Sequence, residues 1–102
     1  MTFIQTISFS TSRMDEMQAL METFGNVAHH QGGSVPGLLA TRVVKDRDRE
    51  NAYMVIVEFE SYELAMENSA RPETDAFARE MAELSDGPPT FGNYDLVYEE
   101  RS

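Results

Sequence analysis

The segment AYMVIVEFES, residues 52–61, decides the fold that we expect for this chain. Its β-branched and aromatic residues are those that favour strands, and the segment is bounded by polar residues on both sides. Apolar side chains occupy both faces, with Met54 and Ile56 on one and Tyr53, Val55 and Val57 on the other. The sequence therefore predicts a strand that is covered on both of its faces.

A second strand is predicted directly before this one, at residues 38–44. This apolar run follows a turn at Pro36-Gly37, and the polar block 45–51 separates it from residues 52–59. Two strands joined by a short polar loop are typical of a β-hairpin.

The chain before the hairpin reads as a strand followed by a helix. Residues 2–9 alternate with period 2 and place Gln5 on the same face as three apolar residues, Phe3, Ile7 and Phe9. Ser12 offers an N-cap, and acidic residues follow in the first turn. Apolar residues then recur at spacings of three and four until Gly32-Gly33, which predicts an amphipathic helix.

The chain after the hairpin reads as a helix and a last strand. Ser61 can cap a helix that begins at Tyr62, and the helix is interrupted at Arg71-Pro72 because proline disfavours helical geometry in the residue before it. It is expected to resume after Thr74 and to end near residues 86–89. Residues 91–99 are predicted to form the last strand.

The element order β-α-β-β-α-β indicates one α+β domain over residues 1–102, with a ferredoxin-like antiparallel sheet. Helices in this arrangement cover one face of the sheet. The second face is also apolar, and monomers avoid exposing a patch of that size. We therefore expect a homodimer in which a second copy covers the open face.

Composition and charge exclude several classes of function. The chain has 102 residues and a net charge of −10, which repels nucleic acid and an anionic membrane surface. The basic residues near position 47 alternate with acidic ones and form no stripe. The absence of cysteine excludes a disulfide framework and a thiolate metal site. No signal peptide or membrane span is visible, and we expect a cytoplasmic protein.

The segment Val55–Ala65, VIVEFESYELA, resembles a known pattern when it is read with the Arg71-Pro72 break and the helical turn that contains Phe77. It is similar to the antibiotic biosynthesis monooxygenase-like group of the dimeric α+β barrel superfamily. The resemblance implies a cleft between sheet and helices in each subunit. Members of the group include cofactor-independent oxygenases of polycyclic phenols, quinol oxygenases and haem-degrading enzymes.

The chain departs from the residue patterns of the characterised members. The haem-degrading pattern has Asn in the first strand, Trp in the second helix and a later His, where this chain has Gln5, Asn68 and Phe77 or its neighbour. The phenol-oxygenase pattern has Asn and Trp on one helix, where this chain has Leu64 and Asn68. These departures speak against haem degradation and place the exact phenol-oxygenase chemistry in doubt.

Other candidate sites have simpler explanations. His29 and His30 point about 100° apart on a helix, so both would not bind one metal comfortably. The acid pairs Asp15 with Glu16 and Glu58 with Glu60 suit helix-dipole and strand-end positions better than acid-base catalysis, and the methionines have core spacing. We expect no metal and no cofactor.

Our leading hypothesis is a cofactor-independent monooxygenase that acts on a small aromatic, phenolic or quinone-type molecule. Asn68, Gln5 and Tyr53 are the expected catalytic hydrogen-bond donors. Ligand contacts are expected from Tyr62, Leu64, Phe77 and Tyr94. The alternative is a non-catalytic homodimer that binds a small ligand or serves as an interaction module. A stress-responsive or cyclase-like barrel of the same superfamily is a third possibility.

Overall fold

The computed structural model describes residues 2–30 and 35–102, and describes side chains outside residues 24–30. The elements follow the order β-α-β-β-α-α-β and are β1 (Phe3–Ser10), α1 (Met14–His30), β2 (Leu38–Lys45), β3 (Ala52–Phe59), α2 (Tyr62–Ser69), α3 (Pro72–Leu84) and β4 (Thr90–Asp95). The predicted helix end at Gly32-Gly33 lies outside the described residues.

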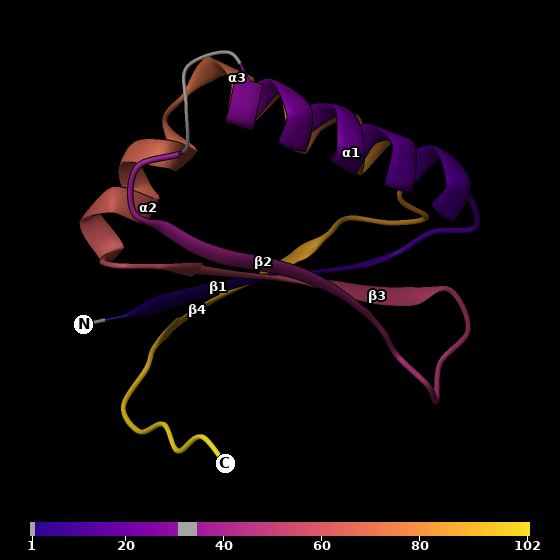
Figure 1. The fold of residues 1–102 in the computed structure, drawn as a ribbon. Helices are drawn as coiled ribbons and strands as arrows, with labels where there is room; N and C mark the ends of the chain where they lie inside the picture. Colours follow the sequence, from indigo (N-terminus) through magenta and orange to yellow (C-terminus); the bar gives the residue numbers. More distant parts are fainter. Residues whose placement is uncertain (1, 31–34) are drawn as a thin grey trace.

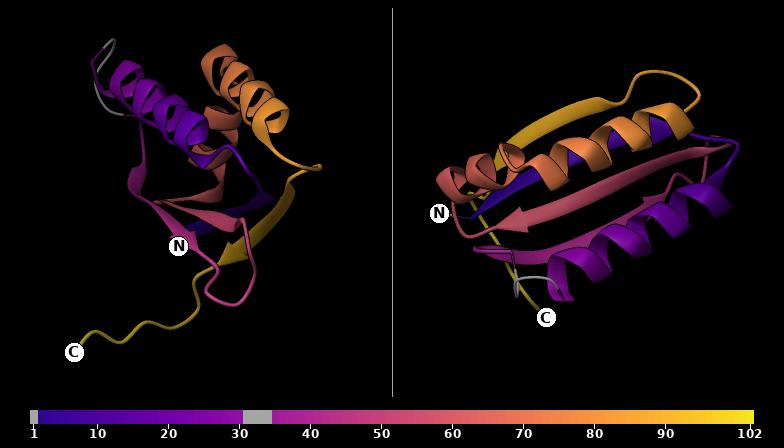
Figure 2. Two further views of the ribbon diagram at one scale, coloured as in Figure 1. Left: turned by 90° about the vertical axis from the view of Figure 1, so that its right-hand side faces the viewer. Right: turned by 90° about the horizontal axis from the view of Figure 1, so that it is seen from above.

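The four strands form one antiparallel sheet in the order β2-β3-β1-β4. This order is ferredoxin-like and confirms the predicted fold class. All three helices lie over the same face of the sheet (Figures 1 and 2). The segment 52–59 pairs with β1 on one side and β2 on the other, so β3 is an interior strand of the sheet. Among the described residues, no helix is long and apolar enough to cross a membrane, and the cytoplasmic location stays a prediction.

The core between sheet and helices consists of two clusters of buried side chains. One lies where β1 and β3 meet α2 and contains Phe3, Val35, Phe59 and Ala65. The other lies where the opposite ends of these strands meet α1 and α3, and contains Phe9, Met17, Val55 and Met81. The odd-numbered residues of β1 and β3 face the helices in both clusters, as the period-2 pattern predicts.

The proline at the start of α3 divides the predicted second helix in two. Arg71 is extended, with φ −73° and ψ 139°, as expected for a residue before proline. Pro72 then occupies the first turn, where its missing N–H costs no hydrogen bond. For this reason α3 begins at Pro72, and the prediction that helix resumes only after Thr74 was wrong.

The predicted caps have different outcomes. Ser61 caps α2 as expected, because its hydroxyl accepts a hydrogen bond from the Leu64 N–H at 3.2 Å. Ser12 lies before the start of α1, and its hydroxyl instead donates to Asp86 Oδ1 at 3.4 Å. The polar contacts at that junction come mainly from its neighbours.

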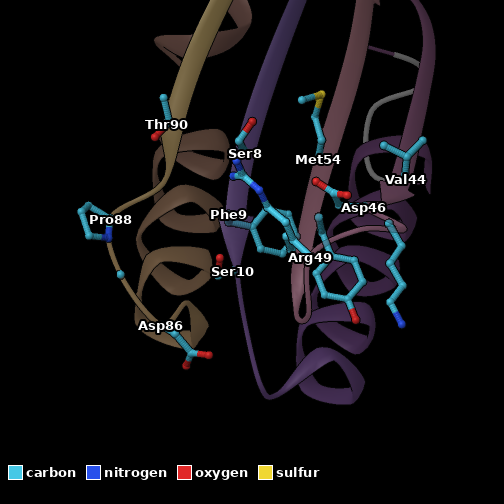
Figure 3. Close-up of a pocket in the computed structure, with 14 residues that line it drawn as sticks. Ser8, Phe9, Ser10, Val44, Asp46, Arg49, Met54, Asp86, Pro88 and Thr90 are labelled. Atoms are coloured by element: carbon cyan, nitrogen blue, oxygen red, sulfur yellow. The ribbon is translucent and has the colours of Figure 1, made fainter.

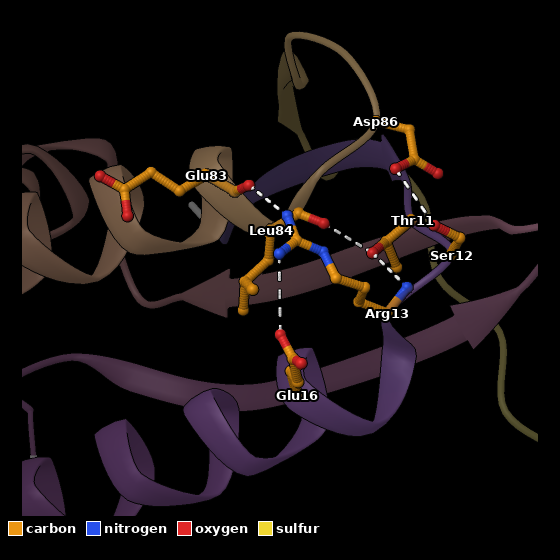
Figure 4. A network of polar contacts seen from close by, with 7 residues as sticks. All are labelled: Thr11, Ser12, Arg13, Glu16, Glu83, Leu84 and Asp86. Atoms are coloured by element: carbon orange, nitrogen blue, oxygen red, sulfur yellow. Dashed lines mark hydrogen bonds and ion pairs between the residues drawn. The ribbon is translucent and has the colours of Figure 1, made fainter.

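Thr11 and Arg13 join the start of α1 to the end of α3 (Figure 4). Thr11 is fully buried, and its hydroxyl donates to the Leu84 carbonyl at 2.7 Å and accepts from the Arg13 N–H at 3.0 Å. The Arg13 guanidinium donates to the Glu83 carbonyl at 2.6 Å. These bonds satisfy carbonyls at a helix C-terminus that have no partner within the helix.

The last strand is shorter than predicted. Asp95 pairs with Phe3, the first residue of β1, and the Leu96 N–H donates to the Thr2 carbonyl at 2.9 Å. Beyond this point β1 offers no further partner, so β4 ends at Asp95. Val97 and Tyr98 are 87% and 76% exposed in the segment that follows, which runs away from the helices (Figure 1).

Candidate functional site

A cleft of about 380 Å³ lies between the helix-facing side of the sheet and the helices, and residues from every element line it. The volume is within the range that small-molecule sites occupy. Its walls are mostly apolar: Ile7, Val55 and Val57 come from the sheet, Met81 from α3 and Phe91 from β4. The sheet residues reach the cleft because alternate side chains of a strand share one face.

Asn68 lies in the last turn of α2 and lines the cleft. The Thr74 hydroxyl, from the first turns of α3, donates to Asn68 Oδ1 at 3.4 Å. Both side chains are partly buried. The break at Pro72 therefore places two polar side chains from successive helices at one end of an apolar cleft.

Gln5 lies in the middle of β1 and also lines the cleft. It pairs with Asn93 of β4, and the Gln5 Nε2 group donates to Asn93 Oδ1 at 3.4 Å. The sheet therefore contributes the Gln5 carboxamide to the cleft, and this carboxamide is hydrogen-bonded to the Asn93 side chain of the neighbouring strand.

Three of the seven predicted site residues lie at this cleft. Besides Asn68 and Gln5, the partly buried Phe77 of α3 lines it and packs against the core cluster around Met81.

Asp75 also reaches the cleft, where it pairs with the exposed Arg79. The hydrogen bond and the negative charge of Asp75 raise the pKa of Arg79 above its usual value. Arg79 and Asp75 thus form an ion pair one helical turn apart on α3.

Tyr53 lies outside the cleft, in two neighbouring cavities. Its ring is stacked on that of Phe9, with centroids 5.7 Å apart and an interplanar angle of 19°. One cavity, of about 440 Å³ between α1 and the β2–β3 hairpin, adjoins the cleft because Met21 and Val43 line both. The other, of about 470 Å³, lies at the hairpin end of the sheet, where Arg49 forms part of the wall (Figure 3).

The other three residues that were predicted to contact a ligand, Tyr62, Leu64 and Tyr94, lie away from the cleft. Tyr62 is 52% exposed and meets Phe3 edge to face, with ring centroids 5.3 Å apart. Leu64 packs against the turn at Gly37. Tyr94 is 56% exposed and pairs with Ile4 on the sheet face away from the helices. None of the three lines the cleft, and their roles in ligand binding stay predictions.

The alternative sites weighed from sequence gain no support. Glu58 lies on the outer face of the sheet, where it pairs with Arg42 at 3.5 Å. Within residues 2–30 and 35–102, no group of three or more metal-ligating side chains was found. The side chains of His29 and His30 lie outside the described residues.

Comparison with solved structures places this architecture among known folds. A mutant of SnoaB, a cofactor-independent oxygenase from Streptomyces nogalater, matches with a TM-score of 0.80 at 15% identity, over 96% of this chain and 95% of its own. A candidate antibiotic biosynthesis monooxygenase from Caulobacter crescentus matches with a TM-score of 0.79 at 14% identity, over 95% and 91% of the two chains. The chain has the antibiotic biosynthesis monooxygenase-like fold.

The same fold extends to Rv0793 from Mycobacterium tuberculosis, with a TM-score of 0.76 at 12% identity over 99% of this chain and 100% of that one. No family profile matches the sequence, and no curated protein matches it significantly. The likeness is therefore one of architecture. The comparisons show the antibiotic biosynthesis monooxygenase-like fold and leave the chemistry to be argued from the side chains at the cleft.

Sequence reasoning missed two residues at this site, Thr74 and Asn93. The sequence pattern presents Thr74 only as the boundary of a helical segment, and its contact with Asn68 depends on where α3 begins. Asn93 lies two residues after Phe91, so the period-2 pattern alone places both side chains on the same face of the strand. Its contact with Gln5 depends on the β1–β4 register, which the pattern of β4 alone does not fix.

Proposed function

We propose that this chain is an antibiotic biosynthesis monooxygenase-like protein that oxygenates a small aromatic, phenolic or quinone-type molecule without a cofactor. One observation carries the proposal: two carboxamide side chains, Asn68 and Gln5, line an otherwise largely apolar cleft of about 380 Å³. Apolar walls with a few oriented polar groups are typical of sites for small organic ligands. The likeness in fold to a cofactor-independent oxygenase supports the choice of reaction.

The substrate itself would supply the electrons in this reaction. Loss of a proton from an electron-rich phenol or anthrone gives an anion, which transfers electrons to dioxygen and forms a carbon–oxygen bond. The resulting hydroperoxide loses water, so a methylene group and O₂ become a carbonyl group and H₂O. The protein contributes orientation, exclusion of water and hydrogen bonds to the developing oxyanion.

Asn68 is the residue to which we assign the oxyanion contact. It lines the cleft from the last turn of α2, and its carboxamide carries an N–H donor that can contact a ligand there. Gln5 orients the ring system from the sheet side. Tyr53 was expected as a third donor, but it lies in the adjoining cavity, and the proposal assigns it no contact with the reacting atoms.

Oxygen uptake tests the proposal. Purified protein is supplied with anthrone, a hydroxylated anthrone and a naphthohydroquinone, and dioxygen consumption is followed with an electrode. We expect at least one compound to be consumed faster than in a heat-denatured control, with a quinone as product. Uptake no faster than the control across the series would argue for the second candidate function.

The second candidate is a non-catalytic module that binds a small ligand through the same cleft. The sequence contains no tryptophan, although the characterised oxygenases that it resembles carry one on the second helix. Ligand binding without oxygen uptake would decide in favour of this candidate.

We also propose that the chain forms a homodimer through the outer face of its sheet. In the described part of the chain, no element covers this face, which carries Ile4, Val44, Met54, Ile56 and Tyr94. Val44 and Tyr94 are 42% and 56% exposed. A second copy presents the same apolar surface and would remove both from water.

A further inference from the structure

A single charged side chain lies along the cleft. Of the described residues that line it, Asp75 is the only one with an ionisable group, and the others are apolar or carry amides or hydroxyls. Asp75 lies in the first turn of α3 and directly follows Thr74, which contacts Asn68. The carboxylate therefore belongs to the same end of the cleft as the carboxamide to which we assign the oxyanion contact.

The two oxygens of this carboxylate are engaged differently. Arg79 donates to Asp75 Oδ2 through Nε, at 3.0 Å, and through Nη2. Asp75 Oδ1 has no hydrogen-bond partner among the described residues. An ionised carboxylate only accepts hydrogen bonds, so its role does not depend on which way the group is turned. One oxygen is thus free to take a proton while the other stays paired with Arg79.

Stability alone does not distinguish Asp75 from its neighbour Glu73. Both are acids in the first turn of α3, where negative charge suits the helix dipole. Both also form exposed ion pairs, Glu73 with Arg71 at 3.1 Å and Asp75 with Arg79. Only Asp75 lines the cleft. The two residues therefore differ in access to a bound ligand, and Glu73 is a matched control for Asp75.

The proposed reaction begins when the substrate loses a proton, so the cleft requires a proton acceptor. The side chain of Asp75 is 56% exposed, which places it at the open side of the cleft. A proton taken up there can pass on to water. A positioned carboxylate of this kind is a common general base.

We propose that Asp75 is the general base of this site. The methylene C–H bond of an anthrone-type substrate breaks, its electron pair stays on the substrate as an enolate, and the proton forms an O–H bond with the carboxylate. No electron leaves the substrate in this step, so the step requires no dioxygen. This inference rests on the proposed function, because it assigns a further catalytic residue to the same site.

Hydrogen–deuterium exchange tests this step without oxygenation. Anthrone is incubated with the protein in deuterated water under argon, and deuterium uptake at the methylene carbon is measured by mass spectrometry. The rate in buffer alone is subtracted. We expect the wild-type protein to accelerate exchange, and Asp75→Asn to lower the protein-dependent rate by about 10²-fold or more, as is typical when a general base is removed.

Controls separate the lost base from lost charge and lost binding. Glu73→Gln removes the same charge from the same turn and should leave the rate unchanged, whereas Asp75→Glu keeps a carboxylate and should exchange faster than Asp75→Asn. Anthraquinone has no methylene proton, and calorimetry should give it equal dissociation constants for the wild-type protein and Asp75→Asn. Exposed ion pairs contribute little to stability, and thermal unfolding of each variant confirms that it is folded.

An exchange rate in Asp75→Asn equal to that of the wild-type protein would overturn the inference. An equal loss in Glu73→Gln would also overturn it, and so would a wild-type protein that does not accelerate exchange. The proposed function fails separately. Exchange that depends on Asp75 but occurs without oxygen uptake would remove the oxygenase and leave the base standing, whereas oxygen uptake that is undiminished in Asp75→Asn would do the reverse.

Discussion

The buried hydroxyl of Thr11 shows how a single residue connects distant parts of the chain. It bridges the Leu84 carbonyl and the Arg13 N–H, with no exposure to water. Removal of this hydroxyl would leave the partly buried Leu84 carbonyl and the Arg13 N–H without their partner, at a cost of at least one average hydrogen bond.

Thr11→Val should therefore lower the free energy of unfolding by about 1–3 kcal/mol, because two backbone groups lose their partner. Urea unfolding followed by circular dichroism measures the change. Ser12→Ala is the control, since Ser12 is exposed and makes one long contact, and we expect a change within about 0.5 kcal/mol. Equal effects of the two substitutions would show that the bridge contributes little.

Gly37 is required by its backbone conformation. Its φ is +79°, and a Cβ atom at this position would lie 2.5 Å from Leu64 Cδ1. Gly37→Ala should destabilise the protein by about 1–3 kcal/mol. In the control Gly87→Ala, nothing lies within 4 Å of the added Cβ and φ is outside the positive range. Thermal unfolding of both variants tests this, and a neutral Gly37→Ala would contradict it.

At the scale of elements, helix boundaries depend on local chemistry that the sequence contains. Ser61→Ala should destabilise α2 by about 1 kcal/mol, because the hydroxyl caps the Leu64 N–H. Ser61→Asp keeps an acceptor at the same place and should retain most of the stability. Chemical denaturation of the two variants measures the difference. If the alanine and aspartate variants were equally destabilised, the cap would not be the cause.

The same scale shows what sequence could and could not predict. The period-2 pattern of β1 and β3 correctly divided their residues between the two faces of the sheet, because each alternation is local. The position of Tyr94 required the β1–β4 register, which pairs Asn93 with Gln5 and so turns Tyr94 to the outer face. Likewise, Thr74 reaches Asn68 only because α3 begins at Pro72. Contacts between elements could not be derived from patterns within them.

At the scale of the whole molecule, the outer face of the sheet and the net charge have opposing effects on dimer stability. Two copies that each carry −10 repel one another, whereas burial of the apolar face favours association. We expect native mass spectrometry to show a species of twice 11.5 kDa. In solution, light scattering should show that added salt strengthens the dimer, because salt screens the repulsion.

A substitution on each face provides the control for this dimer. Ile56→Lys places a charge on the outer face of the central strand and should give a monomer. Ala76→Lys introduces the same charge at an exposed position of α3, on the other side of the molecule, and should leave the dimer intact. A wild-type protein that is monomeric at all salt concentrations would contradict the proposed assembly.

Oxygen incorporation tests the central claim most directly. The wild-type protein and Asn68→Leu are incubated with anthrone-type substrate under isotopically labelled dioxygen, without added metal or cofactor, and the quinone is analysed by mass spectrometry. The account predicts one labelled oxygen atom per product molecule and a rate about 10²-fold lower in the variant, as is typical when an oxyanion donor is removed. Label no greater than in the heat-denatured control, or an equal rate in Asn68→Leu, would contradict it.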